Sequence, residues 1–410
     1  MEIMLCGTNM SDVKISNRSA ILRLLHESGA MSRKQIAARL KLTSATITVI
    51  INELISESIL VEGISIPNAG AAGRREVLVE ISHEKYVALG LALCKGQVKF
   101  TAVNLYGEKI CEETFLLPEE ITPQYFLDHV CSQVWTMIGS HGFSEEYIVG
   151  LGIIICGVVD CANGIILDSD GFWNEKNVPI VKMLRQVFPF PVVVANNVRS
   201  FANAYAFLKR DPKMQNMLFI RNEATMGAAL VLDGRFYDGD RNLSAGIAHY
   251  PVVPNGRRCH CGKRGCLDTV ASQDGMMASL SEEFGEETTP LLYRQTGGDF
   301  SKVTFSMFLE SAYSGDQGAA DVLNKAQETF ASAVAFAIQL LDVQRVIFHG
   351  EMFRNRQFFC SWQKLLTQKT EGSYKENSYR AVPSEMQIEL VAAPILAVNF
   401  YFNAGGHKNY

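Results

Sequence analysis

The sequence predicts an α/β protein with an N-terminal winged helix-turn-helix followed by a body of two α/β lobes. Three observations lead to this fold class. Residues 16–81 have a helical apolar pattern and then a strand-like one. From Tyr86 onward, strand meanders mixed with helices occur twice over, which indicates two α/β lobes. Residues 248–269 hold three cysteines and two histidines in a Gly- and Arg-rich run, which indicates a metal-binding loop in the second lobe.

These patterns divide the chain into four segments. We expect a flexible N-terminal arm over residues 1–15 and the winged helix-turn-helix over residues 16–82. The first lobe is expected over residues 86–198, completed by a C-terminal helix over residues 393–405. The second lobe is expected over residues 199–392, with the metal loop inside it.

Composition and charge restrict the class of protein. A net charge of −5 over 410 residues excludes a uniformly basic nucleic-acid coat, but it allows a local basic module. The sequence has no run of about 18 apolar residues and no signal-peptide pattern, so we expect a cytoplasmic protein without a membrane span. Most cysteines outside the metal loop are scattered, which favours buried free thiols over disulfides: Cys6, Cys94, Cys111, Cys131, Cys156 and Cys360.

Three helices with clear start and stop signals precede the two wing strands. Gly29 is a typical end for the first helix. Ser32 and Gln35 form a predicted capping box at the start of the second, and Thr43 caps the third. The third helix has an apolar inner face and a small or polar outer face, as a helix in a DNA major groove requires. Its outer face is expected to comprise Ala45, Thr48, Val49 and Asn52.

A basic stretch supports DNA binding by this module. Between Lys14 and Lys41 there are seven Lys or Arg residues and one acid, Glu27, which is the electrostatic pattern of phosphate contact. A three-helix protein-interaction module is the alternative. We predict phosphate contacts, base contacts and wing contacts, respectively, for these residues: Arg33 and Lys34; Ser44, Ala45, Thr48 and Asn52; Arg74 and Arg75.

The cysteine cluster has the composition of a zinc site. Cys259, Cys261 and Cys266 supply three soft ligands within eight residues. His249 is the better fourth ligand, because His260 lies between two cysteines that already bind. With four protein ligands the site is closed, so the zinc is expected to be structural rather than catalytic. Three free thiols in a loop are the alternative.

Several stretches resemble the ROK family of repressors, open reading frames and sugar kinases. They are "AGIAHYPVVPNGRRCHCGKRGCLD", "SRKQIAARLKLTSATITVIINELISESILVEG" and "GRREVL", and the resemblance extends from about Asn17 to Asn403. It points to the transcriptional-regulator branch of the family. It implies a winged helix joined to a two-lobed, ribonuclease-H-like sugar-kinase body of the actin and hexokinase type. It also implies zinc on the four ligands named above and assembly into homodimers or homotetramers.

The departures from the family pattern argue against kinase activity. Family kinases have a general-base Asp where this chain has Asn197, and an amide cannot accept the proton. The first phosphate loop of the kinases corresponds here to "LGLALCKG", with Leu91, Leu93 and Cys94 at positions that need polar or Gly residues. The second corresponds to "TMGAA", residues 225–229. An active kinase would need Asp268 or Asp160 as a substitute base.

The sugar pocket implied by the resemblance is also altered. Gly246 stands where sugar-binding members have a Glu, and Asp268 replaces a second Glu. Asn196, Asn197 and His249 complete the set of residues predicted to bind an effector. Either the effector is an unusual sugar or sugar derivative, or sensing has been lost.

We therefore predict a transcriptional regulator that binds operator DNA and acts as a repressor of carbohydrate-related genes. One alternative is a ligand-blind repressor that a protein partner regulates, and another is an active sugar kinase with a DNA-binding head. A third is a nucleic-acid binder that acts through the basic cysteine loop. Its basic residues are Arg257, Arg258, Lys263 and Arg264.

Overall fold

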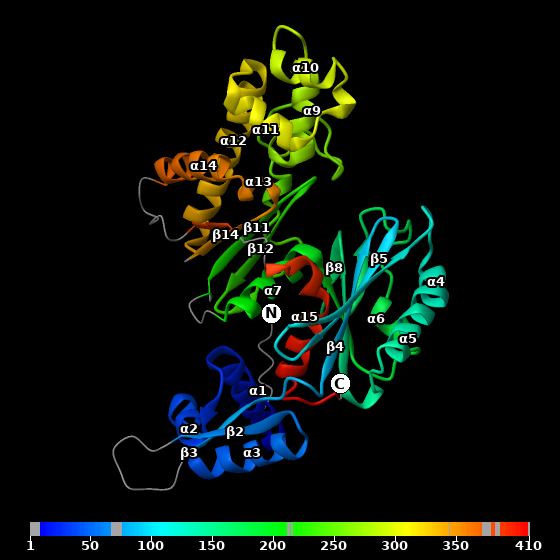
Figure 1. Ribbon diagram of the computed structural model, residues 1–410, viewed down its shortest axis with the longest axis vertical. Coiled ribbons are helices and arrows are strands. Elements are labelled where there is room, and N and C mark those ends of the chain that lie inside the picture. Colours follow the sequence, from blue (N-terminus) through cyan, green and yellow to red (C-terminus); the bar gives the residue numbers. More distant parts are fainter. Residues whose placement is uncertain are drawn as a thin grey trace. The chain divides into compact units, whose positions relative to one another are not determined.

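A computed structural model describes residues 9–66, 76–210, 214, 216–343, 345–370, 379–381 and 386–408. The chain divides into two compact units, which are described separately here. The first unit comprises Met1–Pro212 with Gln387–Tyr410, and the second comprises Lys213–Met386 (Figure 1). In the described part of the chain, every helix is too short or too polar to cross a membrane.

The first unit begins with the winged helix-turn-helix. Its β3 pairs antiparallel with both β1 and β2, so that β2 and β3 form the wing. The tip of the wing, residues 67–75, lies outside the described residues, and with it Arg74 and Arg75. The elements are α1 (Met10–Ser28), β1 (Met31–Ser32), α2 (Arg33–Leu40), α3 (Ser44–Ser56), β2 (Leu60–Ile66) and β3 (Glu76–Ile81).

The prediction of a flexible arm over residues 1–15 is wrong for its second half. Helix α1 already begins at Met10. Its first turn is closed by a capping box, in which the Asn9 side chain accepts from the Asp12 N–H at 2.8 Å and Asp12 accepts from the Asn9 N–H at 3.3 Å. Asn and Asp are strong capping residues at this spacing, so the box could have been found in the sequence.

The predicted caps and inner face of the other two helices are confirmed. Ser32 and Gln35 form the capping box of α2, and Thr43 caps α3. Gly29 ends α1 with a φ of +75°, a conformation that favours glycine. The core side of α3 consists of buried aliphatic side chains: Ile47, Ile50, Ile51 and Leu54.

The rest of the first unit is built on a five-stranded sheet with the order β10-β7-β4-β5-β6. Strands β4, β5 and β6 form an antiparallel meander, whereas β7 runs parallel to β4 and β10. Strands β8 and β9, which come between β7 and β10 in the chain, form a separate two-stranded sheet. The strands are β4 (Val87–Cys94), β5 (Gln97–Asn104), β6 (Lys109–Leu116), β7 (Ile148–Ile155), β8 (Val158–Asp160), β9 (Ile165–Asp168) and β10 (Val192–Asn196).

Helices cover both faces of this sheet (Figure 1). On one face of the sheet, buried residues of α5 pack in a core with alternate residues of β4. Helix α15 packs on the opposite face. Helix α15 lies so close to β7 that a Cβ at Gly152 would come within 1.8 Å of the Ala393 carbonyl oxygen. The helices are α4 (Pro123–Tyr125), a π-turn (Phe126–Val130), α5 (Cys131–Ser140), a 3₁₀ turn (Glu145–Tyr147), α6 (Ile180–Leu184), α7 (Asn197–Lys209) and α15 (Ile388–Asn403).

The border between the lobes differs from the predicted one. We expected the second lobe to span residues 199–392, but α7 and the first residues of α15, 388–392, belong to the first unit, together with the rest of α15, which was expected there. The reason is that α15 packs along α7 and on the sheet of that unit. The amphipathic pattern of α7 does not specify which sheet it covers, so the sequence could not place this border.

The second unit has a five-stranded sheet with the order β13-β12-β11-β14-β15. Strands β11, β14 and β15 are parallel, and β12 is antiparallel to β11 and β13. The strands are β11 (Met217–Asn222), β12 (Met226–Leu232), β13 (Arg235–Phe236), β14 (Arg345–His349) and β15 (Tyr379–Ala381).

Helices pack on this second sheet around a core rich in aromatic rings. Phe330 of α12 stacks on Trp362 of α14 with ring centroids 4.9 Å apart, and Phe348 of β14 meets the same Trp edge-on at 4.6 Å. The helices are α8 (Asp268–Ala271), α9 (Gln273–Glu283), α10 (Pro290–Thr296), α11 (Phe305–Ser314), α12 (Gln317–Leu341), α13 (Glu351–Arg354) and α14 (Arg356–Lys369), with 3₁₀ turns at Ile247–His249 and Phe300–Lys302.

Candidate nucleic-acid interface and metal centre

The outer face of α3 is exposed, as predicted. Ala45, Thr48, Val49 and Asn52 all lie on the solvent side of the helix, and Ser44 is exposed at its first turn. The Thr48 hydroxyl donates to the Ser44 carbonyl oxygen at 2.8 Å. The Val49 side chain is 57% exposed, which is unusual for an aliphatic residue and suits contact with a thymine methyl group.

Two of the predicted DNA contacts are paired with each other. The Arg33 guanidinium donates to the Asn52 side-chain oxygen at 3.1 Å and to the Glu62 carboxylate at 3.0 Å. Lys34 is 82% exposed, and its ammonium group lies 3.9 Å from Glu76. Arg33 and Asn52 must therefore exchange these partners before they can bind phosphate or a base edge, whereas Lys34 can reach phosphate directly.

The basic stretch of α1 is only partly a surface feature. Arg18, one of the seven basic residues counted between Lys14 and Lys41, is 1% exposed and lies inside the first unit. The charge pattern alone does not distinguish a buried arginine from an exposed one. A useful signal is the position of Arg18 three residues before Ile21, because that spacing places it on the inner face of the helix.

The four predicted metal ligands of the second unit come together. The ligand atoms of His249, Cys259, Cys261 and Cys266 all lie within 4.8 Å of one another. Cys261 Sγ is 3.7 Å from Cys266 Sγ, and Cys259 Sγ is 3.5 Å from His249 Nδ1. In a tetrahedral zinc site with Zn–S bonds of about 2.3 Å, two sulfurs lie about 3.8 Å apart, and a sulfur and a nitrogen about 3.5 Å apart. The donor set and its spacing therefore fit a tetrahedral metal ion.

The backbone of the loop holds these ligands in place. The Cys259 N–H donates to the Lys263 carbonyl oxygen at 2.8 Å, and the Val252 N–H donates to that of Gly265 at 2.7 Å. Gly265 has a φ of +69°, and a Cβ there would come within 1.7 Å of the Val253 carbonyl oxygen. Only glycine fits this position, because both the conformation and the space exclude a side chain.

His260 and Asp268 lie beside the cluster. His260 is exposed, and its Nδ1 lies 3.9 Å from Cys259 Sγ and 3.7 Å from the Asp268 carboxylate. Asp268 is 6% exposed and accepts from the Met226 N–H at 2.7 Å. Burial raises the pKa of Asp268, although the Met226 N–H opposes this shift. Asp268 thus ties the metal loop to the β11–β12 hairpin, which carries "TMGAA".

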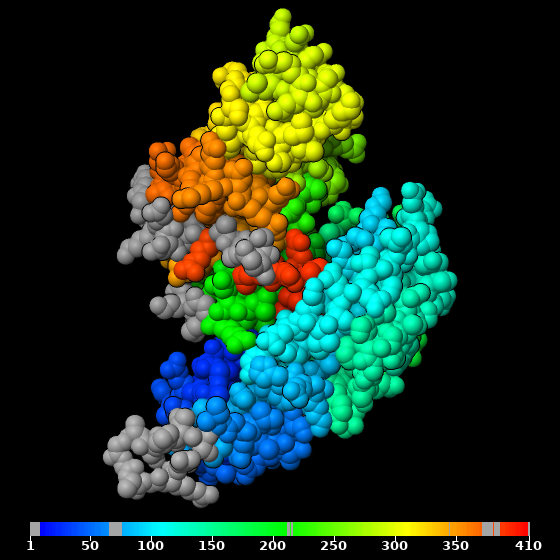
Figure 2. Space-filling model, in the orientation of Figure 1, coloured from blue at the N-terminus to red at the C-terminus, as the bar shows by residue number. Residues whose placement is uncertain are grey.

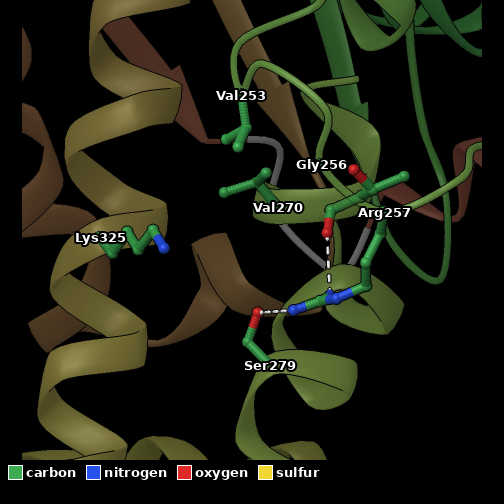
Figure 3. Close-up of a pocket in the computed structure, with 7 residues that line it drawn as sticks. Val253, Gly256, Arg257, Val270, Ser279 and Lys325 are labelled. Atoms are coloured by element: carbon green, nitrogen blue, oxygen red, sulfur yellow. Dashed lines mark hydrogen bonds between the residues drawn. The ribbon is translucent and has the colours of Figure 1, made fainter. Parts of the chain in front are cut away.

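Arg257 anchors the same loop to α9. Its guanidinium donates to the Thr269 carbonyl oxygen at 3.1 Å and to the Ser279 hydroxyl (Figure 3). It also donates to the Gly275 carbonyl oxygen at 2.9 Å. A small cavity of about 180 Å³ is lined by Arg257, Thr269 and Ser279 together with Val253 and Lys325. Because the Arg257 guanidinium donates its hydrogen bonds to groups within the second unit, it contributes little to a basic surface. This weakens the alternative of a nucleic-acid-binding cysteine loop.

The residues predicted to bind an effector belong to both units. Asn196 is the N-cap of α7, since its side-chain oxygen accepts from the N–H groups of Val198 at 2.9 Å and Arg199 at 3.2 Å. Asn197 donates to Cys156 Sγ at 2.9 Å. In the second unit, Gly246 is exposed, and a Cβ there would meet only the Leu243 carbonyl oxygen, at 3.3 Å. A side chain at position 246 therefore requires the Leu243 carbonyl to move slightly.

The positions that correspond to kinase machinery have other contacts. Leu91 and Leu93 are 1% and 3% exposed and belong to the core of the first unit. Asp160, one of the two substitute bases considered, accepts hydrogen bonds from the side chain and backbone of Asn163, which lower its pKa. A carboxylate stabilised in this way is a weaker base than an ordinary one.

Comparison with known protein families agrees with both parts of the chain. The ROK family matches residues 89–388, and the MarR family matches residues 16–60. The chain belongs to the ROK family. The predicted resemblance is confirmed, and the metal loop and the β11–β12 hairpin both lie within the ROK match.

Three curated ROK-type regulators illustrate the relationship. The DNA-binding transcriptional repressor Mlc of Escherichia coli K12 is 24% identical over 341 residues, which cover 83% of this chain and 82% of Mlc. The dual regulator NagC of the same organism is 26% identical over 348 residues, covering 84% and 82%. The xylose repressor of Bacillus subtilis 168 is 19% identical over 374 residues, covering 91% and 92%.

Solved structures show the same fold. A ROK-family transcriptional regulator, a homolog of the E. coli MLC protein, superposes with a TM-score of 0.78 at 21% identity and covers 96% of this chain and 98% of its own. The ROK hexokinase of Thermus thermophilus superposes with a TM-score of 0.60 at 17% identity, covering 75% and 97%. The fold prediction, a winged helix followed by a sugar-kinase body, is therefore confirmed.

Proposed function

We propose that this ROK protein is a transcriptional repressor of sugar-related genes and that it binds operator DNA through α3. The observation that carries the proposal is the exposed outer face of α3 on a capped, well-packed winged helix. This chain aligns over most of its length with Mlc, named as a DNA-binding transcriptional repressor, with an N-acetylglucosamine repressor and with a xylose repressor. An isologous homodimer would present two such helices to the two halves of a palindromic site.

The four-ligand cluster is proposed to hold a structural zinc ion. His249, Cys259, Cys261 and Cys266 would fill a tetrahedron, which leaves no coordination position for a substrate or a catalytic water. Zinc would supply the bonds that fix the loop, and would stabilise the thiolate form of Cys259, whose pKa burial raises to about 12. The role of this chain is to preorganise the ligands through the loop backbone.

The body is proposed to sense rather than to phosphorylate. Asn197 supplies an amide where a kinase needs a base, and its side chain donates to Cys156. The effector is proposed to be a sugar or sugar derivative bound by Asn196, Asn197, Gly246, His249 and Asp268. Asn196 and Asp268 already hold backbone N–H groups, which leaves them fewer free positions for ring hydroxyls. The Asn197 side-chain oxygen likewise accepts from the Val198 N–H at 2.9 Å, so Gly246 is the effector position chosen for substitution.

Fluorescence anisotropy with DNA from upstream of the gene tests the proposed function. The purified, zinc-loaded protein is titrated at fixed salt, with and without a panel of sugars and sugar phosphates. Saturable, sequence-specific binding that one compound releases supports a sensing repressor. Specific binding that no compound alters supports a ligand-blind repressor instead. Turnover of ATP with any sugar of the panel would contradict the loss of kinase activity.

A gain-of-function variant tests the sugar-binding part. Gly246→Glu supplies the carboxylate that the resemblance places at this position in sugar-binding ROK proteins, and its Cβ would have one close contact, with the Leu243 carbonyl oxygen at 3.3 Å. We expect a roughly tenfold increase in affinity for a sugar effector, because a charge-assisted hydrogen bond to a hydroxyl contributes about 1.5–3 kcal/mol. Isothermal titration calorimetry measures the change, with Gly246→Gln as the uncharged control. Unchanged affinity for every sugar would argue against a sugar site at this position.

A further inference from the structure

Arg18 of α1 is a fully paired, buried arginine at the base of the winged helix. Its side chain is 1% exposed. Nε donates to the carbonyl oxygen of Gly405 at 2.6 Å, and Nη1 donates to Glu57 Oε1 at 3.0 Å. Nη2 donates to the second oxygen of Glu57, which completes a bidentate pair. Such a pair fixes the relative orientation of its two partners as well as their separation.

The partners of Arg18 come from distant parts of the chain: Glu57 and, at 3.4 Å, Glu53 at the end of α3, and Gly405 near the C-terminus. Glu57 is the C-cap residue of α3, the helix with the exposed DNA-reading face. Gly405 lies just after α15, which packs across the sheet of the first unit. Arg18 therefore connects the end of α3 with the C-terminal tail of the body. Arg18 and Gly405 of that tail are 387 residues apart in sequence.

Other contacts surround this connection. The Tyr86 hydroxyl donates to the Glu57 carbonyl oxygen at 2.7 Å, and Lys85 donates to the Ser58 hydroxyl at 3.0 Å. His26 of α1 packs between Phe207 and Phe402, with ring centroids 3.9 Å and 5.9 Å away. In Figure 2, the blue atoms of the winged helix lie directly against the cyan atoms of the first lobe. The C-terminal end of α3 is thus hydrogen-bonded to the two residues that precede β4 of its own unit.

We propose that Arg18 is a positioning residue for operator recognition: together with Glu57 and the tail at residues 404–408, it sets the orientation of α3 relative to the body. This rests on the proposed function of operator binding. A repressor that binds two half-sites needs its two recognition helices at a fixed spacing and angle. The Arg18 pair supplies that rigidity, because it joins α3 to α15 without touching DNA.

Two substitutions separate positioning from folding. Arg18→Lys keeps the charge but loses the bidentate geometry, and Arg18→Met keeps the aliphatic stem and loses both. Lys14→Met is the matched control, because Lys14 lies on the same helix and pairs with α3 through Glu53 at 2.7 Å, but is 49% exposed and does not reach the tail. The first measurement is hydrogen exchange at the end of α3 and in residues 404–408. We expect exchange there to be at least about tenfold faster in both Arg18 variants and unchanged in the control.

The second measurement is operator affinity as a function of half-site spacing. We expect wild type to lose at least about tenfold in affinity when two base pairs are inserted between the half-sites, and Arg18→Lys to lose much less. A variant that only folds less well would lose affinity equally at every spacing, and that result would overturn the proposal. Unchanged hydrogen exchange would also overturn it. Hydrogen exchange is measured without DNA. It therefore tests whether Arg18 holds the end of α3 to the tail even if the wild-type protein binds no operator and the proposed function fails.

Discussion

The metal loop and the base of the winged helix are both held by converging polar side chains, but they differ in how far apart those side chains are in sequence. Three of the four metal ligands lie within eight residues, and the fourth is ten residues upstream of them. Arg18 and Gly405 are 387 residues apart. Local ligand spacing is visible in a sequence, whereas a contact between the two ends of a chain emerges only when the body has folded. The proposed zinc site can therefore be tested with a chelator. The base of the winged helix can be tested by protonating His26 and by substituting side chains that form ion pairs.

The largest expected effect concerns the metal loop. Cys266 is fully buried, and Cys266→Ser removes one soft ligand from the tetrahedron. We expect loss of bound zinc and a decrease of about 3 kcal/mol or more in the free energy of unfolding, because metal binding contributes directly to folding stability. Metal analysis and thermal unfolding of the second unit measure both quantities.

Two controls define this result. Cys360→Ser alters an exposed cysteine on α14 and should change neither quantity. A chelator should reproduce the Cys266→Ser unfolding curve with the wild-type protein. Full stability of the wild-type protein after complete removal of metal would show that the backbone hydrogen bonds of the loop suffice without the ion.

The second effect concerns the base of the winged helix and depends on pH. Burial, together with the positive charges of Arg210 and Arg23, lowers the pKa of His26 to about 3. The unfolded chain therefore binds more protons than the folded one between about pH 6.5 and 3, and the stability conferred by neutral His26 is lost as the pH falls through this range. Between pH 6.5 and 5 we expect a loss of about 2 kcal/mol.

Comparison with two variants isolates the contribution of His26. His26→Phe keeps a ring against Phe207 and should flatten the pH dependence of chemical unfolding, whereas substitution of the exposed His129 by Asn should leave it as in wild type. A wild-type slope that persists in His26→Phe would assign the pH dependence to other groups.

The smallest effect concerns the DNA-reading face itself. Glu62→Gln removes the carboxylate that pairs with Arg33. The side chain of Arg33 is 26% exposed and that of Glu62 is 51% exposed. Such a surface pair contributes at most about 1 kcal/mol to stability, so we expect an unfolding curve close to wild type. DNA affinity should increase a few-fold, because Arg33 is released and a negative charge near the phosphates disappears. Glu286→Gln, in the second unit, is the control for a general change in net charge, and an equal gain in that variant would contradict a local effect.

The sequence predicted what depends on local patterns. The caps at Ser32 and Thr43, the inner and outer faces of α3, and the convergence of His249 with three cysteines all follow from spacing over a few residues. It did not predict the border between the units, because the surface that α7 covers is set by tertiary packing.

The pairing state of charged side chains was equally inaccessible from sequence. The spacing of Arg18 from Ile21 indicates that it is buried but not which groups it pairs with, and Arg257 carries no local mark that distinguishes a paired guanidinium from a solvated one. The roles of Asn196 as a helix cap and of Asp268 as the partner of the Met226 N–H likewise require the folded chain. These contacts explain why the predicted effector residues are the least specified part of the site.

Selection of binding sites from a random DNA library, with wild type and Asn52→Ala in parallel, tests the central claim most directly. If α3 reads the operator, wild type will enrich a defined sequence with two related half-sites. Asn52→Ala will then enrich the same sequence with relaxed preference at one position in each half-site, since a base contact of this kind contributes about 1–3 kcal/mol of discrimination. Absence of any enriched sequence with zinc-loaded wild type, or an identical sequence preference in the two proteins, would contradict the assignment of α3 as the recognition helix.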